Sequence, residues 1–172
     1  MRGGLPEHIN PLHLADTGVQ LAGDLPVTRL QRLKAMLASK EGRVRVTARF
    51  SVDEQGRRVL ELKASADLEM TCQRCMGSVA VPVAVDAALE LVPEESADDA
   101  ASERYEPLVV SRDRMSLAEI VEDELLLQLP MIPRHEEGDD ACLPGAGPGD
   151  GQKQDTAREN PFAVLATLKD KQ

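Results

Sequence analysis

The sequence has few aromatic residues. It contains no tryptophan, and its aromatic side chains are those of Phe50, Tyr105 and Phe162. Hydrophobic residues still make up 42% of the chain, so it can bury a core, which must be built mainly from Val, Leu, Ala and Met. Proteins that bind unpaired bases commonly stack them on aromatic rings. The composition therefore argues against base stacking, and any contact with nucleic acid would involve the phosphate backbone.

Long hydrophobic runs are also absent. No stretch approaches the roughly 18 consecutive apolar residues of a membrane-spanning helix, and Met1–Glu7 lacks the apolar run of a signal peptide. The cysteine count is odd, at three. Together these features predict a cytoplasmic protein without a membrane partner. In that reducing compartment, a close pair of thiols more often binds a metal or reacts in redox chemistry than forms a structural disulfide.

The chain lacks the common catalytic motifs as well. It has no glycine-rich dinucleotide-binding loop, no phosphate-binding P-loop and no nucleophile elbow. Four carboxylates lie close together in sequence without a neighbouring nucleophile or second histidine, and we interpret them as the polar face of a helix: Glu119, Glu122, Asp123 and Glu124. The sequence thus predicts a protein that is not an enzyme and has no small-molecule substrate.

Charge is abundant but unevenly distributed. The net charge of −10 argues against a protein that simply coats nucleic acid. Residues 25–64 nevertheless contain ten basic and four acidic residues, whereas residues 86–140 contain seventeen acidic and four basic ones. This asymmetry indicates either two ordinary solvated surfaces or two faces that bind different partners.

Alternating hydrophobic residues predict three β-strands, over residues 43–52, 58–71 and 79–92. The turn at residues 53–56, Asp-Glu-Gln-Gly, joins the first two strands as a hairpin. Pro82 in the third strand indicates an edge position or a bulge. The three strands are expected to form an antiparallel meander.

Two helices should pack on this meander, which gives an α+β fold. Thr28 is a candidate N-cap for a helix over roughly residues 29–39, where leucine and methionine recur at helical spacing. A capping box that begins at Ser116 predicts a second helix, which should end before Pro130. The other stretches are predicted to be loops or short strands: residues 5–24, 93–107 and 108–110.

The α+β domain is expected to cover residues 1–142, followed by a flexible linker over 143–159 that is rich in glycine and polar residues. A short helix over residues 160–172 should follow, because Asn160 suits an N-cap and Pro161 suits the first helical position. So short a helix is only marginally stable alone. It should therefore dock on its own domain or on a partner through its apolar residues: Phe162, Leu165 and Leu168.

Four residues suggest a metal site. Cys72 and Cys75 are separated by two residues in the turn between the second and third strands, and His135 and Cys142 lie downstream. Three cysteines and one histidine form a ligand set typical of tetrahedral structural zinc. A reduced turn without metal and a redox-active pair are the alternatives. Redox-active thiols usually lie at a helix N-terminus, whereas these lie between strands. The pattern therefore favours one structural Zn²⁺ ion.

A row of arginines occupies one side of the first strand. Arg43, Arg45 and Arg49 alternate with apolar residues and so point in the same direction. Such a row is suited to contact RNA phosphates, although an ordinary polar sheet face has the same pattern. The three arginines are the candidate residues for contact with an RNA backbone.

Three segments occur in a characteristic order: the Cys72–Cys75 turn, the stretch from Val121 to His135, and the stretch from Asn160 to Lys169. Together they resemble the bacterial YceD family, also called the large ribosomal RNA subunit accumulation proteins. The resemblance extends over residues 72–169. It implies a role in the synthesis, processing or stability of 23S ribosomal RNA, and it implies no enzymatic activity.

We therefore expect a non-enzymatic ribosome-biogenesis factor. A basic strand and helix face would contact ribosomal RNA or a pre-ribosomal particle, either directly or through a basic ribosomal protein bound by the acidic half. Two other functions remain open: a thiol- or zinc-dependent enzyme, and a protein adaptor whose C-terminal helix docks into a partner's groove.

Overall fold

The computed structural model describes residues 4–99, 104–111, 114–136, 138–139 and 142. Three long strands dominate it: β3 (Arg43–Val52), β4 (Arg58–Thr71) and β5 (Ser78–Pro93). Their burial alternates residue by residue, as the hydrophobic pattern predicts. The predicted meander is confirmed, because β3 pairs antiparallel with β4, and β4 pairs antiparallel with β5.

Two further strands complete a five-stranded sheet in the order β2-β3-β4-β5-β6. β2 (Gln20–Pro26) pairs antiparallel with β3, whereas β6 (Glu106–Val110) pairs parallel with the end of β5. The parallel pair requires a connection that crosses from one end of the strands to the other. The 3₁₀ helix η2 (Glu94–Asp99) lies in this connection. β1 (His8–Ile9) and β7 (Met115–Ser116) form a separate two-stranded ribbon.

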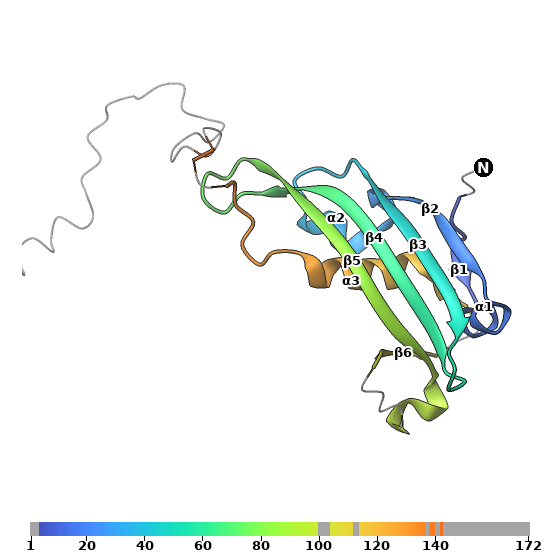
Figure 1. Ribbon diagram of the computed structural model, residues 1–172. Helices are drawn as coiled ribbons and strands as arrows, with labels where there is room; N and C mark the ends of the chain where they lie inside the picture. The colour runs from blue at the N-terminus through green and yellow to red at the C-terminus, as the bar shows by residue number, and fades with distance from the viewer. Residues whose placement is uncertain (1–3, 100–103, 112–113, 137, 140–141, 143–172) are drawn as a thin grey trace, which may run out of the picture.

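All three α-helices of the described residues lie on one face of the large sheet (Figure 1): α1 (Pro11–Thr17), α2 (Gln31–Met36) and α3 (Leu117–Gln128). The core between the two layers contains fully buried Phe50, Leu62 and Leu125. This arrangement confirms the predicted α+β class. The opposite face of the sheet, here called the outer face, is open to solvent. None of these helices is long and apolar enough to cross a membrane.

The helix α3 begins and ends as the sequence predicts. The Ser116 hydroxyl accepts a hydrogen bond from the backbone N–H of Glu119 at 3.3 Å, which satisfies one of the unpaired donors of the first turn. The helix stops at Gln128, two residues before Pro130. Its apolar side, with Leu117, Val121 and Leu125, is buried against the sheet.

The prediction of a helix over residues 29–39 that begins at Thr28 is wrong in its extent. The chain instead forms a 3₁₀ turn η1 (Val27–Arg29) and then the short helix α2, and no side chain of its own segment caps α2. The cap comes from α3, where Glu122 accepts hydrogen bonds from the backbone N–H groups of Arg32 at 2.8 Å and Leu33 at 3.0 Å. A tertiary contact therefore defines this N-terminus.

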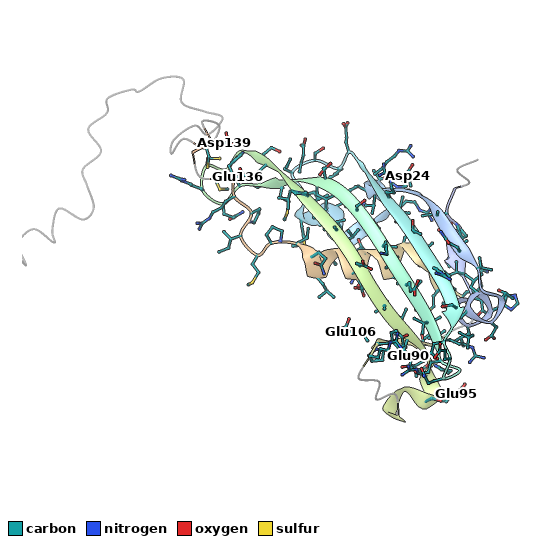
Figure 2. The ribbon with its side chains drawn as sticks, viewed as in Figure 1. Asp24, Glu90, Glu95, Glu106, Glu136 and Asp139 are labelled. Carbon is teal, nitrogen blue, oxygen red and sulfur yellow. The ribbon has the colours of Figure 1, made fainter. Side chains whose placement is uncertain are left out.

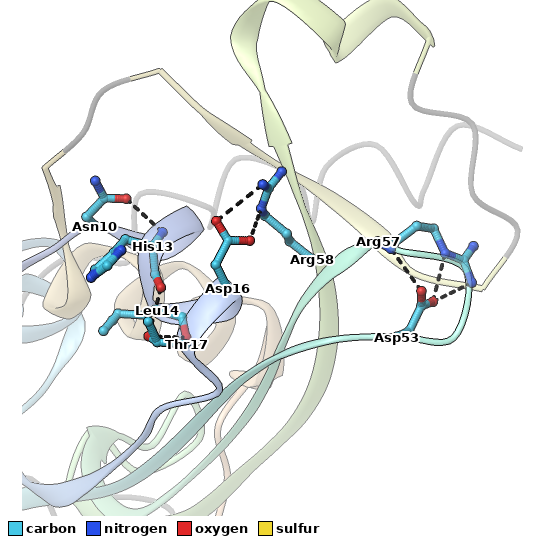
Figure 3. Close-up of polar contacts among 8 residues, drawn as sticks. All are labelled: Asn10, His13, Leu14, Asp16, Thr17, Asp53, Arg57 and Arg58. Carbon is cyan, nitrogen blue, oxygen red and sulfur yellow. Dashed lines mark hydrogen bonds and ion pairs between the residues drawn. The ribbon is translucent and has the colours of Figure 1, made fainter.

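The prediction for residues 5–24 missed the helix α1. The Asn10 side chain accepts a hydrogen bond from the backbone N–H of His13 at 3.1 Å, and Pro11 occupies the first helical position (Figure 3). Gly18, at φ 66°, ends the helix in the left-handed conformation that glycine adopts without strain. Asp16 then joins α1 to β4 through an ion pair with Arg58 at 2.6 Å.

The predicted linker over residues 143–159 and the predicted C-terminal helix over residues 160–172 lie outside the described residues. The proposed docking residues Phe162, Leu165 and Leu168 lie outside them too.

Candidate functional site

The turn between β4 and β5 presents its two cysteines from a tightly bonded loop. The backbone N–H of Cys72 donates to the carbonyl of Gly77 at 2.8 Å, and the N–H of Met76 donates to the carbonyl of Cys72 at 3.0 Å. Met76 has φ 63°, an uncommon conformation for a residue with a side chain. This sharp reversal directs both thiols to the same side of the turn.

The segment that follows α3 runs back to this turn (Figure 1). The backbone N–H of Gln73 donates to the carbonyl of Pro133 at 2.9 Å, which fixes the segment beside the cysteines. Cys142 is positioned by its own N–H, which donates to the carbonyl of Asp139 at 2.9 Å. Three separate parts of the chain therefore meet at the end of the sheet.

The structure brings together all four residues that the sequence suggests as metal ligands. The Sγ atoms of Cys72, Cys75 and Cys142 and a ring nitrogen of His135 all lie within 4.8 Å of one another. The Sγ atoms of Cys72 and Cys142 are 3.8 Å apart, and Cys75 Sγ lies 3.6 Å from His135 Nδ1. These four residues, here called the metal-ligand cluster, lie close enough to bind one metal ion.

Groups around the cluster orient its ligands. The backbone N–H of Arg74 donates to Cys72 Sγ, and the N–H of Gly77 donates to Cys75 Sγ, each at 3.4 Å. His135 Nε2 lies 3.0 Å from the carbonyl oxygen of Ser78, which can only accept, so Nε2 must carry the proton. In neutral histidine this leaves the lone pair of Nδ1 free and directed toward the thiols, as a metal ligand requires.

The local environment shifts the pKa values of two of the thiols in opposite directions. Hydrogen bonds from the backbone N–H groups of Cys75 and Arg74, together with contacts to His135, lower the pKa of Cys72 to about 5. A hydrogen bond to Cys72 raises the pKa of His135. Burial, followed by hydrogen bonding to the other two thiols, raises the pKa of Cys142 to about 11. Cys72 is thus the thiolate of the metal-free cluster.

The cluster is also shielded from solvent. Cys72 is 0% exposed, and Cys75 and Cys142 are each 5% exposed. They form a small secondary core with Met70 and Val79, separate from the main core between sheet and helices. Such burial gives an external substrate no path to the sulfur atoms, whereas it suits thiols that bind a structural metal.

The three candidate RNA-contacting arginines, Arg43, Arg45 and Arg49, all point from the outer face of β3 and are exposed. Arg43 and Arg45 line a shallow depression of about 530 Å³ whose floor includes Ser65 and Ala84. Within the described part of the chain neither of these two makes an ion pair, whereas Arg49 lies 3.8 Å from Glu61. The first two arginines are therefore better placed for an external anion.

The outer face is not uniformly basic. Asp24 and Asp67 also line the depression, and Lys63 is paired with Asp86 at 3.1 Å. The basic residues of the predicted helix do not extend the row, because α2 lies on the opposite side of the sheet and Arg32 pairs with Glu122 at 3.2 Å. The helix therefore does not contribute to the surface that the sequence predicts for RNA contact, and only the arginines of β3 remain from it.

Acidic residues of the second half of the chain gather at both ends of the molecule (Figure 2), and others lie along α3. Glu90, Glu95 and Glu106 lie together where β5 leads into η2 and β6, and we call this the acidic end. Glu136 and Asp139 lie at the other end, beside the metal-ligand cluster. Acidic residues that are close in sequence therefore do not form one continuous surface.

Comparison with known proteins places these features in a family. The profile of the family described as "Large ribosomal RNA subunit accumulation protein YceD" matches residues 60–169. A protein of that name from Haemophilus influenzae is 30% identical over 171 residues, which cover 97% of each chain. The chain belongs to the YceD family. No solved structure matches it.

The YceD profile covers the metal-ligand cluster completely, because all four ligands lie within residues 60–169. It does not cover Arg43, Arg45 or Arg49 on β3. The relative from H. influenzae, however, aligns over nearly the whole chain. The profile therefore spans most of β4 and everything from β5 to α3, together with the cluster.

One important residue was misinterpreted from the sequence. Glu122, expected on an exposed polar face, is only 4% exposed, and its carboxylate also accepts from Arg32 Nε at 3.2 Å. Its spacing contains a signal, because it lies four residues after buried Ala118 and three before buried Leu125. Those intervals place Glu122 on the buried stripe of α3.

Proposed function

We propose that this protein is a non-enzymatic ribosome-biogenesis factor that promotes the accumulation of 23S ribosomal RNA in the cytoplasm. The observation that carries this proposal is the similarity over 97% of both chains to a large ribosomal RNA subunit accumulation protein, together with the YceD profile match. Similarity of that extent argues for a shared function of the whole chain rather than of one motif.

Direct contact with an RNA backbone is assigned to the outer face of β3. Arg43 and Arg45 line the depression, and Arg49 lies two outward positions farther along β3. Guanidinium groups suit phosphate oxygens because they offer several donors in one plane. Asp24 and Asp67 line the same depression and would weaken its attraction for phosphates. We therefore expect a small footprint of two or three phosphates on ribosomal RNA or a pre-ribosomal particle.

The acidic end is assigned to a basic protein partner. Glu90, Glu95 and Glu106 come from three neighbouring elements and face solvent or are only half-buried. Ribosomal proteins are commonly basic because they neutralise RNA phosphates, and carboxylates attract them at a distance. Arg57 and Arg58 lie beside Glu90 and would reduce this attraction. Glu95 and Glu106 should therefore contribute most to it. Binding at this end would leave the arginines of β3, which lie on the open face of the sheet, free to contact RNA.

The metal-ligand cluster is assigned one structural Zn²⁺. With Zn–S distances of about 2.3 Å and Zn–N distances of about 2.05 Å, a tetrahedral ion requires S···S separations of about 3.8 Å and S···N separations of about 3.6 Å. The structure has 3.8 Å between Cys72 and Cys142 and 3.6 Å between Cys75 and His135. Four protein ligands leave no open position for a substrate, so the ion would connect the β4–β5 turn to the segment after α3.

The enzyme alternative has less support. A catalytic thiol must reach its substrate, whereas the most acidic thiol, Cys72, is 0% exposed. The adaptor alternative depends on Phe162, Leu165 and Leu168, which lie outside the described residues.

Ribosome profiles of a deletion strain test the proposal. We expect deletion to lower 23S relative to 16S ribosomal RNA and to reduce free large subunits on a sucrose gradient. Wild-type protein and the variant Cys72→Ala are each expressed in this strain from a plasmid at matched levels. Their comparison shows whether the accumulation of 23S ribosomal RNA requires the metal site. An unchanged 23S level and an unchanged large-subunit peak in the deletion strain would contradict the proposed function.

A further inference from the structure

The largest exposed apolar side chains gather at the end of the molecule that holds the metal-ligand cluster. Met131 is 99% exposed, Ile132 is 56% exposed and Met36 is 53% exposed. Exposing such residues together is unfavourable in water, and a cluster of them commonly marks a binding surface. The other large exposed apolar residues of the described chain are Met76 in the β4–β5 turn, Leu127 in α3, Val52 and Val109.

Two of these residues, Met36 and Met131, line one groove. It has a volume of about 390 Å³ and lies between the end of α2, the end of α3 and the start of the β4–β5 turn. Its walls are mostly apolar: Met36, Met70, Leu126, Leu129, Pro130 and Met131. Methionine side chains adapt to differently shaped ligands, so this lining suits an apolar peptide segment.

The groove adjoins the point from which the rest of the chain continues. Met70 and Leu129, which line the groove, also pack in the secondary core that contains Cys142. Nineteen residues, 143–161, separate Cys142 from Phe162. A glycine-rich stretch of about 20 residues has an end-to-end distance of about 25 Å, which brings the following segment within reach of the groove.

The segment that follows has the composition of a groove ligand. Residues 162–168 read Phe-Ala-Val-Leu-Ala-Thr-Leu, and they are the longest apolar stretch after Cys142. Phe162, Leu165 and Leu168 recur every three residues, so a helix would present them along one side. Groove-binding helices likewise present apolar anchors that are three or four residues apart. Tethering gives the segment an effective concentration in the millimolar range, which no free competitor of equal affinity matches at micromolar concentration.

We propose that the groove lined by Met36, Leu129 and Met131 is the docking site of the chain's own C-terminal segment, with Phe162, Leu165 and Leu168 inserted. The metal-ligand cluster fixes Cys142, the last described residue, beside the groove and so sets the starting point of the tether. This inference does not depend on the role in ribosomal RNA accumulation.

Methionine oxidation in the full-length, zinc-loaded protein tests the docking. If the groove is empty, Met131 should be oxidised faster than Met76, because Met131 is 99% and Met76 is 63% exposed. Met76 is not among the residues that line the groove, so docking should not protect it. A millimolar effective concentration and a segment affinity of about 0.1 mM would occupy the groove in about nine molecules of ten and slow Met131 about tenfold. With tert-butyl hydroperoxide and mass spectrometry, we therefore expect Met131 to react more slowly than Met76.

Matched variants separate docking from other causes. Leu165→Asp should raise the initial oxidation rates of Met131 and Met36 several-fold and leave that of Met76 unchanged. Thr167→Asp is the control, because it adds the same charge on the opposite side of the expected helix and should keep the protection. The zinc content of all three proteins should agree, since the substitutions lie outside the α+β domain. Leu165→Asp should unfold a few degrees lower than the other two, because it loses the stabilisation that the docked segment provides.

Three results would overturn the proposal. Met131 could react faster than Met76 in the unmodified chain, or Leu165→Asp could leave both groove methionines unchanged. Protection that grows over a fifty-fold range of protein concentration would instead assign the groove to a second copy of the chain. Protection that is independent of concentration and lost only in Leu165→Asp supports docking within one molecule.

Discussion

The side chain of Cys72 combines burial with a low pKa, two properties that usually oppose each other. Burial alone raises the pKa of a thiol, because it disfavours the thiolate. Here backbone N–H groups at the β4–β5 turn outweigh that effect and lower the pKa of Cys72 to about 5. The turn thus prepares a thiolate where no substrate can reach it, and a cation is the ligand that such a site favours.

Replacing Cys72 by serine should therefore remove the metal. We expect about one zinc per chain in wild-type protein prepared without chelator, and near zero in Cys72→Ser, because structural zinc requires its thiolate ligands. Elemental analysis measures the ratio. The main core is separate from the cluster, so the variant should stay folded, with faster hydrogen exchange confined to residues 71–78 and 130–136.

Gln73→Ala is the control for this change, since Gln73 lies in the same turn, is exposed and is not one of the four ligands. It should keep its zinc and its exchange pattern. If wild-type protein contained far less than one zinc ion per chain, the proposed zinc site would be wrong.

Glu122 is the second residue whose surroundings determine its role. Its carboxylate accepts two backbone N–H groups of α2 and the guanidinium of Arg32, while only 4% of the residue is exposed. Removal of the carboxylate leaves those two donors without a partner. We expect Glu122→Ala to lower the free energy of unfolding by about 3 kcal/mol, as measured by urea denaturation.

Glu119→Gln serves as the comparison, because Glu119 lies on the same helix but is exposed, and it should change stability by less than about 0.5 kcal/mol. If both variants were equally stable, the capping of α2 by Glu122 would have no energetic weight.

Among whole elements, the long strands were the easiest to predict. The inward residues of β3, such as Val44, Val46 and Phe50, are buried and their neighbours are not, so a period of two identifies the strand without any tertiary information. The same holds for α3, whose cap and stop are both local. The parallel pairing of β6 with β5 was not predictable in this way, because it depends on residues far apart in sequence.

The short helices show the limits of local signals in two different ways. Thr28 has the side chain of an N-cap, yet α2 begins later because the carboxylate of Glu122, some ninety residues away, supplies a stronger cap. For α1 the local signal is present in Asn10, Pro11 and Gly18, and reading it would have found the helix. The metal-ligand cluster was predictable only in part. Its residue types could be recognised in the sequence, whereas the proximity of Cys142 to the other three ligands could not.

Capping should matter for α1 because it has only seven residues. Asn10→Ala removes the acceptor for the N–H of His13 and should lower the free energy of unfolding by about 1 kcal/mol in a guanidinium titration. Asn10→Asp keeps an acceptor and should lose much less. A loss that is the same for both variants would show that the side chain acts through packing rather than as a cap.

At the scale of the whole molecule, the net charge of −10 and the proposed contact with RNA must be compatible. Charges act over about 8–10 Å at physiological salt, so a phosphate responds to the arginines it approaches more than to the total charge. The acidic end lies away from the depression on the outer face, where Arg43 and Arg45 stand beside Asp24 and Asp67. A phosphate there therefore meets a local field far less negative than the total charge suggests. Association with RNA should consequently be weak, and with two or three phosphate contacts its dependence on salt should be modest.

The double variant Arg43→Gln/Arg45→Gln tests this electrostatic arrangement. Each phosphate contact contributes about 0.7–0.9 to the slope of log affinity against log salt, so the double variant should reduce the magnitude of the slope by about 1.5. Filter binding of a 23S ribosomal RNA fragment at several salt concentrations measures it. Lys63→Gln is the matched control, because Lys63 lies on the same face but is already paired with Asp86, and it should change the slope far less. A change in Lys63→Gln half as large as that in the double variant, which removes twice the charge, would indicate a response to total charge and would shift the RNA contact away from β3, whereas a selective change in the double variant locates it on that strand.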